Sequence, residues 1–545
     1  MDARIARLEK LGLRPAATYE ARGGWGQKPL WRRVRDTAIA SPGKAAVIDE
    51  AGAWSYGELW DQAELYAAAM RASGLEKRDI VLVQLPNWRE FVAIAVAAEA
   101  TGVVFSFCPI QWGLRETTRA LELIQPRLWF TTAAPRAGDS RGDLIREALS
   151  LSRSAARPVL LRSSPEPQTQ GCADFLSLAA QYRWGEKDGA SGRDPLEIAV
   201  TSGSTGDPKG VLHVHDSALA TVQSTIRRQG ITADDVIHLA IPVGHTFGYF
   251  YGVRCAMQAT ATLVLQERWD AAKMLELVSR HRATVSLGPS AFVLDLLQHA
   301  EQAGDALKRV WLFTHSGDSL PAPTARRAQT ALPFRISRAL GMTEFGHTTS
   351  TDAQTDPERS IDSLGTPQPE MELKIVDGES KAVARGVEGR ILVRGPFVFA
   401  GYLLPDRLNE DVLDADGWFD TGDLGYLDEG GHLHMTGRLK NVIRRGAETI
   451  PVSVLEDVIS SMPQVAHAVV VGMPDERMGE MPVACVQVRD GSTLTMQELT
   501  GAFEANGVTK KFWPTQMQLF TSWPIGATGK IDRKMIVEQL MQGNA

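Results

Sequence analysis

The chain has 545 residues, of which 44% are hydrophobic and 23% are charged, and its formal net charge is -7 at pH 7. This length exceeds what a single hydrophobic core supports, so two or more domains are expected. The balance of 58 basic against 65 acidic residues argues against a nucleic-acid-binding protein, because such proteins carry a strong basic excess.

The N-terminal segment and the apolar runs predict a cytoplasmic protein without a membrane span. MDARIARLEKLGLRP is charged and lacks the apolar centre of a secretory signal. No run approaches the ~18 apolar residues that a membrane-spanning helix needs. His213 and His215 form an HxH pair, but no further Cys or His lies close by in the sequence. That spacing favours structural histidines over zinc ligands.

Apolar runs alternate with segments of helical length through most of the chain. The run at 79–87 predicts a strand, 88–100 predicts a helix and 102–107 predicts another strand. Continuous apolar runs bounded by turn residues are typical of strands that are covered on both faces. The alternation therefore predicts an α/β fold with largely parallel sheets. Further strands are predicted at 126–132, 158–163, 197–202, 283–290 and 309–317.

The pattern changes after Met371. MELKIVD and GRILVRG alternate polar and apolar residues around a glycine turn, which predicts a smaller β-rich subdomain of antiparallel strands. A domain boundary is predicted near Gly437, after the turn-rich stretch DEGGHLHMTG. The roughly 100 residues beyond it suffice for a small α+β domain. We therefore predict a large N-terminal domain over 1–437.

Small donors and one lysine crowd the stretch VTSGSTGDPKG, Val200–Gly210. Gly203 and Gly206 let backbone N–H groups approach phosphate oxygens, and Lys209 adds a point charge on a long stem. The spacing matches neither a Walker loop nor a dinucleotide GxGxxG loop, and a solvated surface turn is the alternative interpretation. The stretch predicts a polyanion site that comprises Thr201, Ser202, Gly203, Ser204, Thr205, Gly206 and Lys209.

This loop resembles the phosphate-binding loop of the acyl-adenylate-forming superfamily. That superfamily includes acyl- and aryl-CoA synthetases, the adenylation domains of peptide synthetases, and luciferases. The resemblance covers nearly the whole chain, because further motifs of the superfamily follow in the same order. It implies an ATP-dependent carboxylic acid–CoA ligase that forms an acyl-adenylate and then an acyl-CoA thioester. ATP, Mg²⁺ and coenzyme A are the implied cofactors.

LGMTEFG, Leu340–Gly346, resembles the segment of the superfamily that contains a Thr-Glu pair. By that resemblance Thr343 contacts phosphate and Glu344 helps to hold Mg²⁺, a hard cation that prefers oxygen ligands. Leu340 departs from the aromatic residue that many relatives stack against adenine. The TGD motif supplies Asp423, which would accept hydrogen bonds from the ribose hydroxyls. Further ATP contacts are implied for Gly317, Asp318, Gly341, Met342 and Arg438.

The C-terminal motifs imply a moving domain. Lys440 matches the hinge position within 438–445, about which a mobile C-terminal domain over 446–545 would turn. PIGATGKIDRK resembles the catalytic loop of that domain, in which Lys530 stabilises charge between the carboxylate and the α-phosphate. Coenzyme A phosphates could contact Arg444, Arg445 and Gly446.

The candidate acid pocket is aromatic and apolar. PVGHTFGYFYG resembles the superfamily segment that contacts the acid, and it supplies His245 as a carboxylate contact or gate. The composition suits an aromatic, alicyclic or medium-length apolar acid. The predicted pocket residues are His245, Phe247, Phe250, Gly288, Phe292, Phe345 and His347.

The sequence leaves more than one candidate for the thiol that accepts the acyl group. Coenzyme A is the first choice, and a phosphopantetheine arm on a separate carrier protein is the second, because several segments resemble stand-alone aryl-acid AMP ligases. A non-catalytic nucleotide-binding protein is a third class. The complete set of Thr343, Glu344, Asp423 and Lys530 weighs against that class. The expected partners are thus a small carboxylic acid, ATP and coenzyme A, with a carrier protein as the alternative acceptor, and no nucleic acid.

Overall fold

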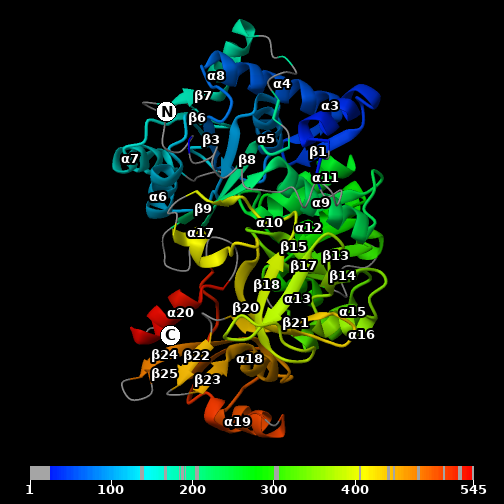
Figure 1. Cartoon of the computed structure of the whole chain (residues 1–545), viewed down its shortest axis with the longest axis vertical. Helices are drawn as coiled ribbons and strands as arrows, with labels where there is room; N and C mark the ends of the chain where they lie inside the picture. The colour runs from blue at the N-terminus through cyan, green and yellow to red at the C-terminus, as the bar shows by residue number, and fades with distance from the viewer. Residues whose placement is uncertain are drawn as a thin grey trace.

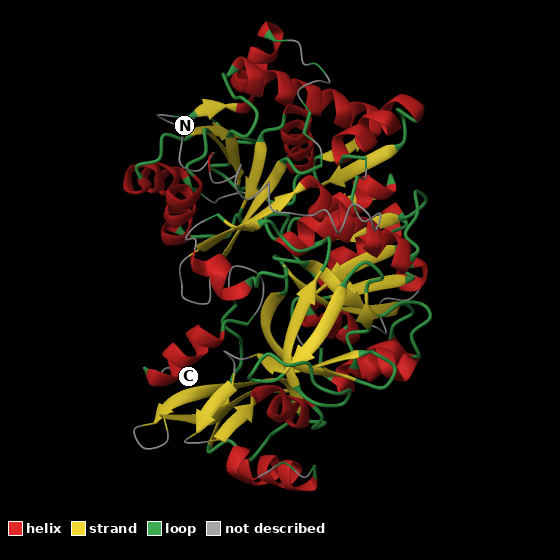
Figure 2. Ribbon diagram, in the orientation of Figure 1, coloured by secondary structure: helices red, strands yellow, loops and turns green. Residues whose placement is uncertain are grey.

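The chain folds into two large sheets, a small antiparallel sheet and a separate C-terminal sheet, with helices packed around them (Figures 1 and 2). The C-terminal sheet lies at the end of the molecule opposite β6 and β7 (Figure 1). This is a computed structural model, and it describes residues 6, 25–26, 28–135, 140–164, 169–182, 185, 189–190, 192–202, 208–299, 306–318, 320–403, 407–438, 442–445, 448–475, 479–506, 508, 510–525 and 531–542.

The first large sheet has eight strands in the order β19-β9-β8-β4-β3-β5-β6-β7. Its central strands pair in parallel and are fully buried, as their continuous apolar runs predict. The antiparallel pairs β8·β9 and β9·β19 close one edge. The strands are β3 (Ile80–Val83), β4 (Val104–Phe107), β5 (Leu128–Thr131), β6 (Arg157–Leu160), β7 (Gln170–Gly171), β8 (Pro195–Ser202), β9 (Pro208–Val214) and β19 (Gly401–Tyr402).

The second large sheet has nine strands in the order β16-β15-β14-β13-β12-β10-β11-β1-β2. It is parallel from β1 through β14, and antiparallel hairpins extend it at both ends. The strands are β1 (Ala45–Asp49), β2 (Gly52–Ser55), β10 (Val236–Leu239), β11 (Thr262–Leu265), β12 (Val285–Gly288), β13 (Leu312–His315), β14 (Arg335–Met342), β15 (Gly346–Ser350) and β16 (Thr366–Pro367).

Helix boundaries follow local capping chemistry. The Ser55 hydroxyl accepts from the Glu58 N–H while the Glu58 carboxylate accepts from the Ser55 N–H, which starts α4. Gly102 and Gly230 end α5 and α9 in the left-handed conformation that glycine adopts without strain. The helices of this part of the chain are α3 (Leu30–Ala40), α4 (Tyr56–Ala72), α5 (Arg89–Thr101), α6 (Leu114–Ile124), α7 (Gly142–Ser152), α8 (Cys172–Ser177), α9 (His215–Gln229), α10 (Thr246–Gly248), a π-helix (Tyr249–Arg254), α11 (Cys255–Ala259), α12 (Ala271–His281), α13 (Ser290–Gln298), α15 (Ala322–Ala331), α16 (Pro357–Asp362) and α17 (Arg407–Val412).

The small sheet confirms the predicted change to antiparallel β-structure. Its order is β17-β18-β20-β21, and every neighbouring pair is antiparallel. The strands are β17 (Glu372–Val376), β18 (Gly389–Arg394), β20 (Phe419–Leu427) and β21 (Leu433–Arg438). This sheet and the two large sheets contribute to one continuous hydrophobic core.

The C-terminal residues have hydrophobic clusters of their own, one on each face of the sheet. The sheet is β22 (Val442–Arg445), β23 (Glu448–Pro451), β24 (Val465–Asp475), β25 (Gly479–Val488) and β26 (Gln516–Leu519), with α18 (Val452–Ser460), α19 (Met496–Ala505) and α20 (Arg533–Met541) packed around it. The α/β class and the separate small α+β domain are therefore confirmed. The exact domain limits stay predictions, and β22 lies inside the predicted hinge interval.

Among the residues that the structure describes, no helix combines the length and the apolar character needed to cross a bilayer.

Candidate active site

The strands that flank the phosphate loop form an antiparallel hairpin. In β8·β9 the register pairs Thr201 with Lys209 and Ser202 with Pro208. The neighbouring strand packs closely at Gly210, where an added Cβ would lie 3.1 Å from the Ile198 side chain. Thr201 and Lys209 are therefore cross-strand neighbours at the mouth of the predicted loop.

Lys209 and Glu344 contact the same tyrosine, Tyr402. The Lys209 ammonium lies 4.9 Å from the centre of the Tyr402 ring, over its face. The Tyr402 hydroxyl donates a 2.7 Å hydrogen bond to Glu344 Oε1. Both Tyr402 and Glu344 are buried. Burial raises the pKa of Tyr402 above its ordinary value, and the Glu344 carboxylate raises it further, so the hydroxyl keeps its proton.

The turn that holds Thr343 and Glu344 is fixed at both residues. His213 Nε2 donates a 2.7 Å hydrogen bond to the Thr343 carbonyl oxygen, and the Phe399 N–H donates a 2.8 Å bond to the Glu344 carbonyl oxygen. Burial lowers the pKa of His213 to about 4, so its ring is neutral at physiological pH. His213 thus positions the turn, in agreement with its interpretation as a structural histidine.

Two glycines of the same motif allow close packing. Gly346 has φ +57, and an added Cβ would lie 2.3 Å from the Thr221 hydroxyl. An added Cβ at Gly341 would lie 2.6 Å from the His347 ring. Leu340, Gly341 and Met342 form the end of β14, directly before the turn.

The predicted ribose contacts form an ion pair. Asp423 of β20 lies opposite Arg438 of β21, and Arg438 Nε is 2.7 Å from Asp423 Oδ1. Burial raises the pKa of Asp423, and the neighbouring carboxylates of Glu344 and Asp420 add to this effect, whereas Arg438 opposes it. Apart from that ion pair, no described group donates a hydrogen bond to either Asp423 carboxylate oxygen. The carboxylate can therefore accept hydrogen bonds from a ligand.

Asp318 anchors the turn after β13 to the start of α13. Its carboxylate accepts bonds of 3.1 Å from both the backbone N–H and the hydroxyl of Ser290, and it lies 3.1 Å from His315 Nε2. Gly317 beside it has φ +99, a conformation that favours glycine. The negative charge of Asp318 also acts on His467 of β24, so this turn faces the C-terminal domain.

The predicted acid-pocket residues separate into two groups. His245 caps α10 by accepting a 3.2 Å hydrogen bond from the Phe247 N–H. The Phe247 ring centre lies 5.8 Å from that of His347, and His347 stacks on Tyr251 at 3.5 Å and 3°. Burial lowers the pKa of His347 to about 3, so the His347 ring is neutral at physiological pH.

The second group packs in the core. Phe250 and Phe345 are fully buried, against His213 and Phe419 respectively. Gly288 ends β12 beside Phe292, whose ring would clash with any Cβ at 2.3 Å. Phe292 in turn stacks on Trp269 at 3.6 Å.

The predicted catalytic loop of the C-terminal domain is held at both ends. Ile525 forms a β-bridge with Ile531, and the Asp532 N–H donates a 2.8 Å hydrogen bond to the Pro524 carbonyl. Arg533 is paired with Glu456 of α18 at 2.7 Å. These contacts tie the two ends of the loop to the body of the domain.

Several predicted residues lie outside the described residues, so their placement stays a prediction. They are Gly203, Ser204, Thr205, Gly206, Lys440, Gly446 and Lys530, together with the side chains of Ser202 and Arg444. Arg445 is in β22, opposite both Glu448 and Gly479.

Comparison with known proteins identifies the family. The family "AMP-binding enzyme" matches residues 34–403, more than half of the chain, and "AMP-binding enzyme C-terminal domain" matches residues 454–530. The chain belongs to the AMP-binding enzymes. The expectation of an enzyme from the adenylate-forming ligase superfamily is confirmed.

Relatives of this AMP-binding enzyme include ligases of two kinds. A medium-chain fatty-acid–CoA ligase of Escherichia coli (strain K12) is 30% identical over 96% of this chain and 93% of its own. A salicyl-AMP ligase/salicyl-S-ArCP synthetase of Mycobacterium tuberculosis (strain ATCC 25618 / H37Rv) is 31% identical over the same shares. ATP-bound MatB from Rhodopseudomonas palustris is 26% identical, with a TM-score of 0.83 over 95% of this chain and 99% of its own; apo MatB gives 0.72.

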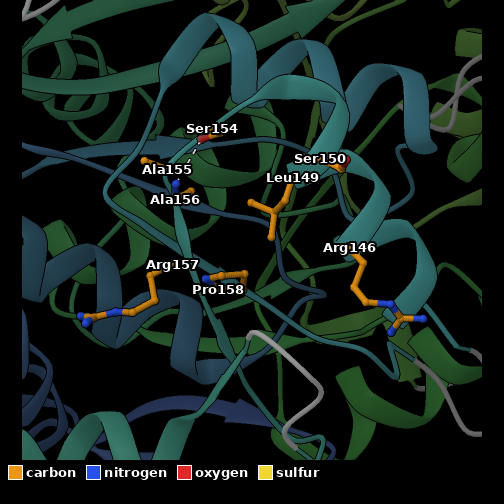
Figure 3. Close-up of a pocket in the computed structure, with 8 residues that line it drawn as sticks. All are labelled: Arg146, Leu149, Ser150, Ser154, Ala155, Ala156, Arg157 and Pro158. Atoms are coloured by element: carbon orange, nitrogen blue, oxygen red, sulfur yellow. Dashed lines mark hydrogen bonds between the residues drawn. The ribbon is translucent and has the colours of Figure 1, made fainter.

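A surface pocket of this AMP-binding enzyme lies away from the motifs. It has a volume of about 490 Å³ between the end of α7 and the start of β6, and its lining includes Arg146, Ser150 and Arg157 (Figure 3). The Arg146 guanidinium is paired with Asp143. None of the predicted site residues lines this pocket.

Two tyrosines of the site were not predicted from the sequence. Tyr402 links Lys209 to Glu344, and Tyr251 stacks on His347. Tyr251 belongs to the aromatic segment PVGHTFGYFYG, and its phenol was a signal that could have identified it. Nothing in the sequence alone relates Tyr402 to Glu344 and Lys209, which lie 58 and 193 positions earlier in the chain.

Proposed function

We propose that this AMP-binding enzyme is an ATP-dependent ligase that joins an apolar carboxylic acid to coenzyme A. One observation carries the proposal: Lys209, Glu344 and Asp423 converge, although they come from three different hairpins. Tyr402 contacts the first two, and the Glu344 charge acts on Asp423. A nucleoside triphosphate requires a cation for its phosphates, a carboxylate for the bound metal ion and an acceptor for its ribose hydroxyls. Lys209, Glu344 and Asp423 supply these three groups.

The residues present suit Mg²⁺ bound together with the triphosphate. Glu344 offers a buried carboxylate with only Oε1 engaged by Tyr402. No cluster of three or more His, Cys, Asp or Glu occurs among the described residues. A single carboxylate suffices, because Mg²⁺ usually binds one or two carboxylates plus substrate phosphates and waters. When bound there, Mg²⁺ would neutralise phosphate charge.

In the first half-reaction, a carboxylate oxygen of the acid attacks the α-phosphorus of ATP and pyrophosphate leaves. The loop donors and Lys209 hold the phosphates, and Asp423 fixes the ribose, so that the attack is in line. Lys530 stabilises the charge that builds on the phosphate oxygens. Thr343 and Leu340–Met342 line the nucleotide with Gly317 and Asp318.

In the second half-reaction, the thiol of coenzyme A attacks the acyl carbon and AMP leaves. The thiol proton passes to a base or to solvent, and the products are the thioester and AMP. The C-terminal domain turns about Lys440 between the two steps, which withdraws Lys530. Arg444, Arg445 and Gly446 then face the phosphates of coenzyme A. This chemistry requires pools of ATP and coenzyme A, and we retain the cytoplasm as the expected location.

The acid has an apolar body. His245, Phe247, Tyr251 and His347 form an aromatic cluster whose His347 ring is neutral, since burial lowers its pKa to about 3. An aromatic wall with a neutral His347 favours an aromatic, alicyclic or medium-length aliphatic monocarboxylate over a diacid. The medium-chain fatty-acid–CoA ligase relative supports this class.

A carrier protein is the second candidate acceptor. It is favoured by the 31% identical relative that is named both a salicyl-AMP ligase and a salicyl-S-ArCP synthetase. In that case a phosphopantetheine thiol on a separate protein takes the place of free coenzyme A. The adenylation step is the same for both acceptors.

The test is a panel of aromatic, alicyclic and C6–C12 aliphatic acids with ATP and Mg²⁺, with and without coenzyme A. We expect pyrophosphate release with at least one acid and an acyl-CoA of the corresponding mass. Pyrophosphate release without acyl-CoA would reject coenzyme A and favour the carrier protein. No pyrophosphate with any acid, although ATP binds, would favour a non-catalytic nucleotide-binding protein.

A further inference from the structure

Tyr402 lies between two groups of opposite charge and contacts each with a different part of its side chain. The ring face lies under the Lys209 ammonium at 4.9 Å, and the hydroxyl donates to Glu344 Oε1 at 2.7 Å. The face of an aromatic ring is electronegative and attracts cations. A phenolic O–H is a donor and therefore suits a carboxylate.

Lys209 and Glu344 do not neutralise each other. The ion pairs found among the described residues do not include Lys209, whose ammonium contacts the neutral Tyr402 ring. A direct Lys–Glu pair would satisfy both charges before any ligand arrived. With the ring between them, no described carboxylate pairs with the ammonium, and among the described residues the hydrogen bond to Glu344 involves Oε1 alone.

The fold holds Tyr402 firmly in this place. It lies in β19, which pairs with β9 so that Tyr402 is opposite Val211 and two positions from Lys209 along the partner strand. The Tyr402 N–H donates a 2.6 Å bond to Asn409 Oδ1, and the Asn409 amide donates back to the Tyr402 carbonyl at 3.1 Å. The ring is buried and packs against Phe399 at 4.9 Å.

We propose that Tyr402 is a positioning residue that would present Glu344 to a divalent cation and Lys209 to the phosphates of the same nucleotide. The hydroxyl fixes one Glu344 oxygen so that the other points to the cation. The ring supports the ammonium without removing its charge. This inference rests on the proposed function for the identity of the polyphosphate, but it concerns binding and not the acid.

The test measures binding of Mn²⁺, a spectroscopic substitute for Mg²⁺, in the presence of α,β-methylene-ATP. Tyr402→Phe keeps the ring and removes the hydroxyl, so Mn²⁺ binding measured by electron paramagnetic resonance should weaken about tenfold, as expected for one hydrogen bond to a charged group. The KM for ATP at saturating Mg²⁺ should stay within about twofold. Tyr402→Leu removes the ring as well and should raise that KM.

Tyr426→Phe is the matched control, because Tyr426 stacks on His434 in β20·β21 and its hydroxyl has no hydrogen-bond partner among the described residues. It should bind Mn²⁺ like the wild type. Unchanged Mn²⁺ binding by Tyr402→Phe would overturn the proposal. Failure of Tyr402→Phe to fold would also overturn it, because the hydroxyl would then be needed for folding and not for binding. A wild type that binds Mn²⁺ and nucleotide but adenylates no acid would contradict the proposed function and leave this inference standing.

Discussion

At the level of single residues, two histidines of the site are neutral and the lysines and arginines carry its positive charge. His213 and His347 are neutral because burial lowers their pKa values to about 4 and about 3. They therefore contribute hydrogen bonds and packing, while positive charge comes from lysine and arginine. Lys209 and Arg438 are the described examples, and Lys530 is the predicted mobile one.

Lys530→Ala should separate the two half-reactions. Adenylate formation should fall by about 100-fold or more, because one preorganised charge stabiliser of the transition state is lost. Thioester formation from supplied acyl-adenylate should stay within about threefold, since the proposed mechanism withdraws Lys530 in that step. Pyrophosphate release and thioester formation measured separately would check both values.

Lys534→Ala is the control for that prediction. Lys534 belongs to the same segment, its side chain is 82% exposed, and its nearest acidic partner is Glu538 at 4.0 Å. It should leave both half-reactions unchanged. Equal losses in the two half-reactions for Lys530→Ala would contradict the assigned role.

At the level of elements, a buried ionic cluster joins the π-helix, α5 and β8 behind the hairpin of the predicted phosphate loop. Arg254, at the end of the π-helix, contacts Glu99 of α5 at 2.5 Å and Glu197 of β8 at 3.8 Å. All three side chains are fully buried. A buried ion pair costs desolvation, and removing one partner typically destabilises by about 3–5 kcal/mol. This cluster therefore links the hairpin to the segment that carries His245.

The cluster predicts a pH dependence of stability. Burial raises the pKa of Glu197 to about 8 from a model-compound value of 4.5, with Arg254 opposing the shift and Glu99 adding to it. Because the folded-state pKa is the higher one, the stability from protonated Glu197 is fully present below about pH 4.5 and is lost as the pH rises through about 8.

Glu197→Gln should remove this dependence, because the amide has nearly the same shape and does not ionise. Between pH 6 and 9 the melting temperature of the wild type should fall by at least ~2 °C more than that of the variant. Calorimetry at both pH values measures the difference. Glu358→Gln, at a side chain that is 76% exposed, is the control. Parallel pH profiles for Glu197→Gln and wild type would contradict the prediction.

At the scale of the whole molecule, the C-terminal domain lies against the end of the second large sheet. α18 contacts α15 and β21, and Asp457 of α18 acts electrostatically on the buried Arg338 of β14.

Lys440→Pro should slow the change between arrangements, because proline fixes φ and removes the N–H at the predicted hinge. Adenylate formation should persist, whereas thioester formation should fall by at least about tenfold, as one arrangement becomes inaccessible. Lys440→Ala keeps backbone freedom and should retain both activities. Single-turnover assays with purified acyl-adenylate give the measurement, and normal thioester formation by Lys440→Pro would remove the hinge assignment.

The sequence by itself determined the features that depend on local pattern. The apolar runs predicted β3, α5 and β4 because burial on both faces requires continuous apolar residues. The motif order predicted the family, which the matches over residues 34–403 and 454–530 confirm.

Only the tertiary structure decided which distant residues share the site. Tyr402 reaches Glu344 across 58 positions and Lys209 across a strand pairing, and no local periodicity encodes either contact. No local periodicity encodes the buried cluster of Glu99, Glu197 and Arg254 either. The protein interior tolerates these ionisable side chains only because three elements bring them into contact. The sequence determines the chemistry of each side chain. Binding depends on the distances between charged groups, and tertiary packing sets those distances.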